Sequence, residues 1–158
     1  MIAVTPSTLL RNWKKLENSS LGRWMYSRLI GFAVPYSGSI KADVLKLDPG
    51  YAKIAMKDRR KIRNHLKSIH AMALVNLAEL ASGLAMLSGL PENARGIVTG
   101  FSIEYMKKAR GRIFAESSFD PPSDNTEREY EVDIVLKDIA GENVATAKAK
   151  WLIGPVNV

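Results

Sequence analysis

Residues 63–83 read RNHLKSIHAMALVNLAELASG, and this stretch decides the fold. Over residues 69–87 apolar side chains occupy every side of the expected helix, which is the pattern of a helix buried all round. Gly89 and Pro91 are expected to end it. One carboxylate, Glu79, stands inside the apolar run, and no Lys or Arg accompanies it in the helix. Because an ionised carboxylate is costly to bury without a partner, we expect Glu79 to serve a function.

The composition is that of one folded domain. With 158 residues the chain can bury a single sizeable core, and its fractions of hydrophobic residues (46%) and charged residues (25%) are ordinary for a globular protein. The absence of cysteine excludes disulfides, a thiol nucleophile and a cysteine-ligated zinc. Since only His65 and His70 can supply imidazole, we expect no metal site.

The N-terminal sequence does not have the pattern of a secretory signal. Its apolar start is broken by Thr5, Pro6 and Ser7 before a continuous hydrophobic region forms. No run of about 18 uninterrupted apolar residues occurs along the chain. We therefore expect neither export nor a membrane span, and a cytoplasmic location.

The net charge of +7 favours acidic partners such as phosphates, nucleic acid, anionic lipid or an acidic carrier protein. The basic residues form two clusters that flank the apolar helix in the sequence. The first cluster comprises Arg59, Arg60, Lys61, Arg63 and Lys67, and the second comprises Lys107, Lys108, Arg110 and Arg112. Two solvated surfaces are the commoner explanation. Nucleic-acid binding is disfavoured because no aromatic stacking surface or known motif accompanies the charges.

Two amphipathic helices are expected near the N-terminus. Thr5 can cap a helix that begins at Pro6 and continues to about residue 17. A second helix follows the ENSS break. Its apolar residues at helical spacing are Leu21, Trp24, Met25, Leu29 and Ile30. We expect both helices to cover the domain's own core, and the less common alternative is contact with a membrane surface, given the nearby Lys and Arg residues.

Six segments have strand character. Residues 40–47 and 51–57 flank the turn at Asp48, Pro49 and Gly50, so they are expected to form a hairpin. The other four segments cover residues 96–106, 111–119, 128–138 and 143–153. The VPYSGS segment before the hairpin is expected to be a loop.

The last segment explains how sheet and helix can fit together. Ala145, Ala147 and Ala149 share a face with Trp151, so small side chains line the side that must approach something bulky. The central helix is the candidate for that neighbour. We therefore expect the α+β class, with a curled antiparallel β-sheet wrapped around the long central helix.

A small and polar face is expected on the central helix. Asn76, Glu79 and Gly83 follow one another at steps of three and four, so a ligand can approach the backbone there. His70 lies nine residues before Glu79, which places it on the opposite side of the helix. The two residues therefore cannot form a simple dyad within one chain.

The start of the same helix offers a site for an oxyanion. Free N–H groups and the positive end of the helix dipole favour negative charge there, and the amides of Ala71 and Met72 are the candidates. For His70 the competing explanation is a side chain that satisfies backbone groups at the helix start, and for Asn64 it is a turn residue. From composition alone we favour these structural roles.

The pattern of Asn64, His70, Ala71, Met72 and Glu79 resembles the hotdog-fold acyl-CoA thioesterases of the phenylacetate-pathway type. In that family an Asn stands six residues before a His-Gly-Gly motif, and an Asp or Glu follows eight residues after the first Gly. Both spacings recur here, with Ala and Met in place of the two glycines.

The resemblance extends beyond the motif. Residues 96–112 resemble the third strand of the family. The implied architecture is a single domain over residues 1–158, with a hotdog core at residues 40–153 and an N-terminal helical extension at residues 1–34.

The resemblance implies catalytic roles for three residues. Glu79 would be the general base or nucleophile, Asn64 would position the attacking water or the substrate, and His70 would complete the motif. The Ala71 amide would polarise the thioester carbonyl, with Met72 beside it. Because the acid and the Asn come from different subunits in this family, a homodimer or a dimer of dimers is implied.

The expected substrate is the thioester of an acyl group with coenzyme A or a carrier protein, and no cofactor is expected apart from this coenzyme A. Val98 and Thr99 align with an early position of the third strand that carries a hydroxyl in some members. The residues expected to bind substrate are Asn76, Gly83, Val98, Thr99, Lys107, Lys108, Arg110 and Arg112.

Two functions from different classes follow. The first is hydrolysis of an acyl-CoA thioester, with the second basic cluster contacting the nucleotide phosphates. The alternative is a non-catalytic protein that binds acyl-CoA or an acyl-carrier protein, which the replacement of both glycines by Ala71 and Met72 permits.

Overall fold

The computed structural model describes residues 5–156, and six antiparallel strands form its sheet in the order β1-β2-β4-β5-β6-β3. The first two strands, β1 (Asp43–Asp48) and β2 (Tyr51–Met56), form the expected hairpin. The other strands are β3 (Ala94–Tyr105), β4 (Ile113–Ser118), β5 (Arg128–Lys137) and β6 (Asn143–Pro155). All six expected strands are therefore present, each within a few residues of its expected bounds.

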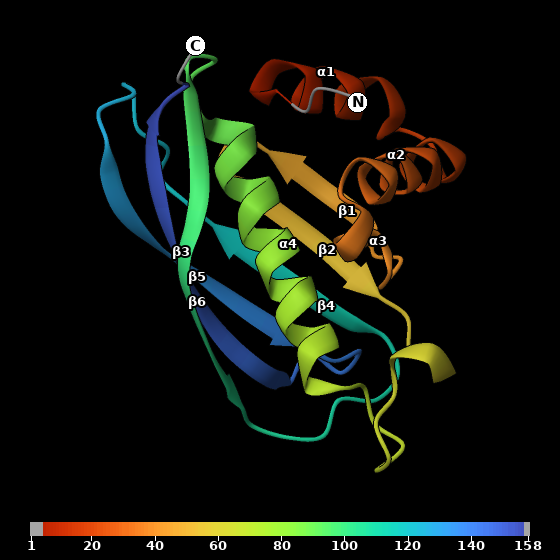
Figure 1. Cartoon of the computed structure of the whole chain (residues 1–158). Helices are drawn as coiled ribbons and strands as arrows, with labels where there is room; N and C mark the ends of the chain where they lie inside the picture. Colours follow the sequence, from red (N-terminus) through yellow and green to blue (C-terminus); the bar gives the residue numbers. More distant parts are fainter. Residues whose placement is uncertain (1–4, 157–158) are drawn as a thin grey trace.

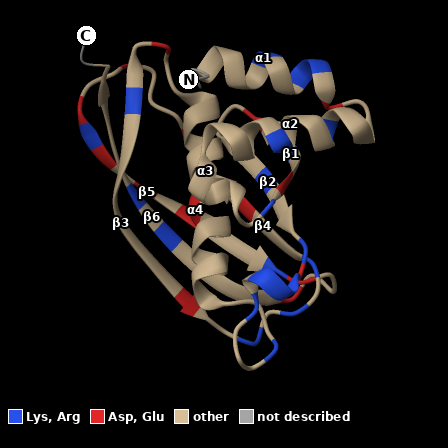
Figure 2. Cartoon of the chain, turned by 45° about the vertical axis from the view of Figure 1, so that its right-hand side comes forward, with Lys and Arg blue, Asp and Glu red and all other residues tan. Residues whose placement is uncertain are grey.

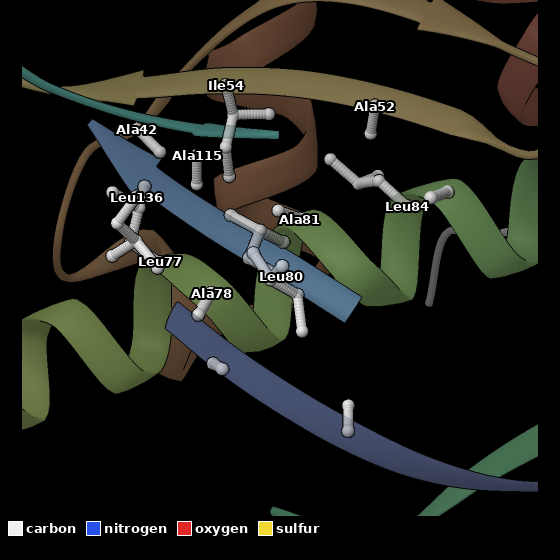
Figure 3. Close-up of a cluster of buried hydrophobic side chains, with 14 of the residues drawn as sticks. Ala42, Ala52, Ile54, Leu77, Ala78, Leu80, Ala81, Leu84, Ala115 and Leu136 are labelled. Atoms are coloured by element: carbon white, nitrogen blue, oxygen red, sulfur yellow. The ribbon is translucent and has the colours of Figure 1, made fainter. Parts of the chain in front are cut away.

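The long helix α4 (Ala71–Gly89) lies across the sheet, which curls around it (Figure 1). Its buried side chains meet residues from several strands, and Figure 3 shows Leu77 and Ala81 of α4 among Ile54, Ala115 and Leu136. On β6 the alanines and Trp151 of one face are buried against this core, as their spacing predicts. The hotdog architecture and the α+β class are thus confirmed.

The expectation that α4 is buried on every side is wrong for one strip of the helix. Met72 is 55% exposed, and Val75, Glu79, Gly83 and Leu87 are only partly buried. These residues follow one another at steps of three and four, so they form one line along the helix. The sheet covers the rest of α4 and leaves this strip open.

Helix α4 also meets the length and mean hydropathy of a membrane-crossing helix, and 61% of that stretch is buried inside the domain. A core helix passes the same test, and the contacts of α4 with the strands identify it as one.

Three helices precede the sheet: α1 (Pro6–Leu16), α2 (Ser20–Ala33) and the short α3 (Pro35–Gly38). The first two confirm the expected helices, and Thr5 caps α1 by accepting a hydrogen bond from the Thr8 N–H at 3.4 Å. The third corrects the expectation of a loop, because Pro35 at the first helical position favours one helical turn there. Residues 1–4 of the expected extension lie outside the described residues.

Helix α2 docks through a face that the sequence pattern does not single out. Tyr26 and Ile30 are buried, and Ser27 Oγ accepts a hydrogen bond of 2.8 Å from the Val44 N–H of β1. Gly22 allows α1 to pass close by, since a Cβ there would clash with the Leu16 carbonyl. Consequently only part of the predicted apolar face covers the core.

The remaining apolar residues of α2 face solvent, which corrects the expectation that they cover the core. Their exposed fractions are 65% for Leu21, 55% for Trp24, 45% for Met25 and 48% for Leu29. On the opposite side of the helix, Gly22 packs closely against α1 and Ser27 hydrogen-bonds to β1. Because this side faces the domain, the apolar side faces solvent.

Candidate active site

Glu79 lies in a mostly apolar cleft of about 200 Å³ beside α4. Helices α2 and α3 supply one wall through Ile30, Val34 and Ser37. The other lining residues are Leu80, Gly83, Leu84, Met86, Leu87, Gly96 and Trp151. Glu79 is the charged residue among them, so the cleft combines room for an apolar group with one carboxyl group.

The environment of Glu79 changes its acidity. Burial raises the pKa of this carboxyl group above the ordinary value, because the cleft replaces water around the charged form. Within residues 5–156 no Lys or Arg forms an ion pair with it. A carboxylate with a raised pKa is a stronger base, which is the property that general base catalysis requires.

A chain of hydrogen bonds fixes the wall of the cleft next to Glu79. The Trp151 indole N–H donates to Ser82 Oγ at 3.3 Å, and Ser82 Oγ–H donates to the Glu79 carbonyl at 2.9 Å. The indole ring lies over Gly83, where an added Cβ would be 3.5 Å from the ring. Gly83 therefore lines the cleft beside Glu79, as its position in the sequence predicts.

Asn76 has a different place from the one expected. It is 6% exposed, and its Nδ2 donates to the Tyr36 carbonyl of α3 at 3.3 Å. Its Oδ1 is buried without a hydrogen-bond partner among the described residues. Asn76 does not line the Glu79 cleft; it ties α3 to α4 and so holds one wall of that cleft.

The start of α4 is organised by His70, which has the structural role that composition favours. Its Nδ1 accepts a hydrogen bond of 3.1 Å from the Met72 N–H, so the imidazole caps the helix. The Met72 amide is therefore occupied, which contradicts its expected part in an oxyanion site. The Ala71 N–H has no partner within the described chain, and it is the amide that can meet an oxyanion.

Asn64 holds the loop before α4. Its Oδ1 accepts hydrogen bonds from the Leu66 N–H, the Ser68 N–H and the Ser68 hydroxyl, and its own N–H donates to the Ser68 carbonyl. The side-chain Nδ2 makes no hydrogen bond in the part of the chain that the structure describes. Asn64 is thus a turn residue with one free amide group.

A second cleft of about 250 Å³ opens at the start of α4. Its lining includes Asn64, Ala71, Tyr105 and Lys108, and the Tyr105 hydroxyl donates to the Ala71 carbonyl at 3.3 Å. The Glu79 cleft shares no residue with it. Glu79 follows Ala71 by eight positions of the helix, about 12 Å along the axis. One chain therefore does not bring Glu79 together with Asn64.

The two basic clusters meet in space at this end of the molecule. Asp58 joins their loops, because its Oδ1 accepts from Arg63 Nε at 2.6 Å and its Oδ2 accepts from the Gly111 N–H at 3.1 Å. These bonds, chiefly the one from Arg63, lower the pKa of Asp58. Figure 2 shows the Lys and Arg residues of both loops gathered where α4 begins.

Only part of the second cluster is available to a ligand. Lys107 Nζ lies 2.6 Å from Asp138 Oδ2 and also pairs with Glu142. Arg112 Nη2 lies 3.7 Å from Asp43 Oδ2, and its guanidinium lies over Phe114. Lys108 and Arg110 are exposed and form no ion pair in residues 5–156. They are therefore the better candidates for phosphate contacts.

Val98 and Thr99 lie on β3, outside both clefts. The strand has a bulge there, and the Thr99 hydroxyl donates to the Lys150 carbonyl at 3.3 Å. Gly96, two residues before Val98, is the β3 residue that lines the Glu79 cleft. Within the described residues no group of three His, Cys, Asp or Glu side chains is placed to hold a metal ion.

Several residues of the cleft were not predicted from the sequence. Ile30, Val34 and Ser37 form its wall; Ile30 belongs to a helix that we expected only to cover the core, and Val34 and Ser37 belong to the segment that we expected to be a loop. The apolar spacing of the second helix contained part of the signal, since Ile30 belongs to it. Trp151 lies on the face that meets α4, as its spacing in the sequence predicts, but its position beside Glu79 depends on the register of β6.

The fold and the cleft define a hotdog-fold domain with a carboxyl group on its central helix. The chain belongs to the family described as a domain of unknown function (DUF4442), which matches residues 22–153. No curated protein matches the sequence.

Solved structures share this architecture. A structural-genomics protein, APC5556, is 27% identical with a TM-score of 0.79, over 96% of this chain and 99% of its own. PA5026 from Pseudomonas aeruginosa, described as a probable thioesterase, is 23% identical with a TM-score of 0.73, over 82% and 93%. A hypothetical thioesterase from Streptococcus pneumoniae with coenzyme A is 16% identical with a TM-score of 0.67, over 81% and 99%.

The raised pKa of Glu79 predicts how stability depends on pH. The folded state binds this proton more tightly than the unfolded chain does, so the contribution of Glu79 to stability falls as pH rises above about 4. We expect the Glu79→Gln protein to gain stability relative to the unsubstituted protein as pH is raised from about 4 toward neutrality. Urea unfolding at a series of pH values measures the difference.

The matched control is Glu127→Gln, which removes a carboxyl group from an exposed loop. A difference between the Glu79→Gln and unsubstituted proteins that stays constant with pH, or that follows the control, would contradict a buried carboxyl group with a raised pKa.

Proposed function

We propose that this protein hydrolyses acyl-CoA thioesters with Glu79 as the catalytic carboxylate. The observation that carries the proposal is a single carboxyl group, with a raised pKa, in an apolar cleft beside the core helix. Further support comes from the similarity to solved structures described as thioesterases, one of them with coenzyme A. The cleft would receive the acyl chain, and Glu79 would act at its thioester end.

The chemistry needs three functions at one place. As a general base, Glu79 takes a proton from water, whose oxygen attacks the thioester carbon; the carbon–sulfur bond then breaks and the thiol leaves with a proton. An N–H donor stabilises the oxyanion formed on the way. The Ala71 N–H at the start of α4, which has no partner among residues 5–156, is suited to this, and the Asn64 Nδ2, likewise unbonded there, is suited to hold water or substrate.

Because Glu79 and Ala71 are about 12 Å apart in one chain, we propose that a second copy completes the site. Strand β3 pairs only with β6 in the described sheet, so its other edge is unpaired. Ile97 and Val98 on this strand are 52% and 39% exposed, and Gly96 of the same strand lines the Glu79 cleft. A copy added along β3 would lie beside that cleft.

Replacing Glu79 tests the catalytic proposal. We expect Glu79→Gln to lower kcat/KM for an acyl-CoA substrate by at least about 100-fold, because the amide cannot accept the proton. Release of the thiol from a panel of acyl-CoAs, followed with a thiol reagent, measures this. The Glu127→Gln variant should keep full activity. Undiminished hydrolysis by the Glu79→Gln protein would refute the assignment.

Mixing two inactive variants tests the shared site. Asn64→Asp keeps the oxygen that organises the loop but removes the free Nδ2 donor. If one site takes Glu79 from one copy and Asn64 from the other, a mixed dimer of Glu79→Gln and Asn64→Asp chains contains one intact site. We expect activity to return after co-expression. If both residues of a site came from one chain, mixing would restore nothing.

Replacing Lys108 and Arg110, which form no ion pair among the described residues, tests whether the site contacts the nucleotide phosphates of coenzyme A. We expect the Lys108→Ala, Arg110→Ala double variant to raise KM for acyl-CoA a few-fold to about tenfold, the range of exposed ion pairs. KM for the N-acetylcysteamine thioester of the same acyl group, which has no nucleotide, should stay the same. The control is Lys148→Ala, which changes an exposed residue on the face of the sheet that points away from α4. Equal effects on both substrates would exclude phosphate contacts.

A non-catalytic acyl-CoA binder is the second candidate. The observation that favours it is the start of α4, where Ala71 and Met72 replace the glycines of related sites and the Met72 N–H is occupied by His70. Saturable binding of acyl-CoA without release of thiol from any member of the panel would support this function over hydrolysis.

A further inference from the structure

The outer face of α2 is apolar along its whole length. We call Leu21, Trp24, Met25, Leu29 and Phe32 the α2 stripe, which follows one side of the helix at steps of three and four. Phe32 is 74% exposed, and the other members are between 45% and 65% exposed. A continuous apolar surface of this kind on a folded protein marks a site of contact.

The polar residues of α2 turn away from this stripe. Arg23 Nη1 donates to the Glu17 carbonyl at 2.7 Å, and Ser27 is buried against β1. Arg28, which starts on the outer side, folds back so that Nη2 donates to the Ala42 carbonyl at 2.8 Å and pairs with Asp43 at 3.0 Å. The stripe is therefore left without a charged group of its own helix.

The charged side chains of the N-terminal segment are mainly basic, and Asp43 and Asp48 of β1 pair with Arg28 and Lys14. Residues 5–42 contain six basic side chains and one acidic side chain, Glu17, which pairs with Lys14. The basic residues are Arg11, Lys14, Lys15, Arg23, Arg28 and Lys41. Arg11 and Lys15 are exposed and form no ion pair among the described residues. An apolar face beside basic side chains is complementary to a surface with negative headgroups and an apolar interior.

We propose that the α2 stripe docks this protein on the surface of an anionic lipid bilayer. The 14 residues of α2 are about 21 Å long, too short to cross a bilayer, so the helix would lie in the interface with its aromatic side chains among the acyl chains. A second copy fits this face less well, because stacking two α2 stripes would bring two basic segments together. The edge of β3 lies at the opposite end of the strand order from β1, against which α2 packs.

Tryptophan fluorescence provides a specific test. Trp24 is 55% exposed, whereas Trp13 and Trp151 are 1% and 6% exposed. Vesicles of phosphatidylcholine with phosphatidylglycerol should shift the emission of the full chain to shorter wavelength, and lipids with brominated acyl chains should quench it. Vesicles of phosphatidylcholine alone should have little effect. In Trp24→Phe the optical response should disappear while the protein still sediments with the anionic vesicles.

A double variant tests the stripe itself. Leu21→Ser with Phe32→Ser should weaken partition into the anionic vesicles at least about tenfold, because two large apolar side chains are lost. Ile139→Ser, at an 82% exposed position in the turn between β5 and β6, should leave partition unchanged. Both variants change exposed residues, and circular dichroism checks that they fold.

Three results would overturn the proposal. The first is failure to bind anionic vesicles. The second is binding without any response of Trp24, which would assign the contact to another basic surface, such as the one at the start of α4. The third is a shift of Trp24 emission that depends on protein concentration and needs no vesicle, which would assign the stripe to contact between copies.

Discussion

Burial of one apolar helix constrains the rest of this structure. Helix α4 has apolar side chains on nearly every side, so no single flat surface can cover it, and the sheet has to curl around it (Figure 1). The curl needs small side chains where helix and strands approach most closely. The buried alanines of β6, with Trp151 seated over Gly83, meet this need. The hotdog architecture is thus a consequence of packing around α4.

The same constraint explains where the candidate site lies. A curled sheet cannot close completely, and the strip of α4 that it leaves open contains Glu79. Helices α2 and α3 then cover part of this strip, which gives an apolar cleft and withdraws water from the carboxyl group. A charged group there destabilises the folded state at neutral pH, and the proposed role of Glu79 in proton transfer would account for its presence. The strip of α4 that the sheet leaves uncovered therefore accounts for both the position of the cleft and the raised pKa of Glu79.

The sequence predicts the helices and strands, because these follow from hydrophobic periodicity. It does not predict contacts that depend on how closely two segments of backbone pack. The strands, the core helix and the position of Glu79 follow from local patterns. The face by which α2 docks does not, because Gly22 and Ser27 gain their importance only from the backbone they touch. Ion pairs across the fold cannot be seen in the sequence, so the sequence predicts Lys107 as a ligand contact although Asp138 pairs with it. The sequence likewise does not show that the Met72 N–H donates a hydrogen bond to His70 Nδ1.

The N-terminal helices lie between the Glu79 cleft and the exposed α2 stripe. Ile30 lines the Glu79 cleft from the inner side of α2, and its neighbour Leu29 belongs to the exposed stripe on the outer side. Asn76 ties α3 to α4 through the Tyr36 carbonyl, so the wall formed by α2 and α3 is anchored to the core helix beside Glu79. A contact that moves α2 would therefore change the width of the cleft directly. If an acyl chain enters the Glu79 cleft and the α2 stripe docks on a bilayer, as proposed, both events depend on the position of one helix.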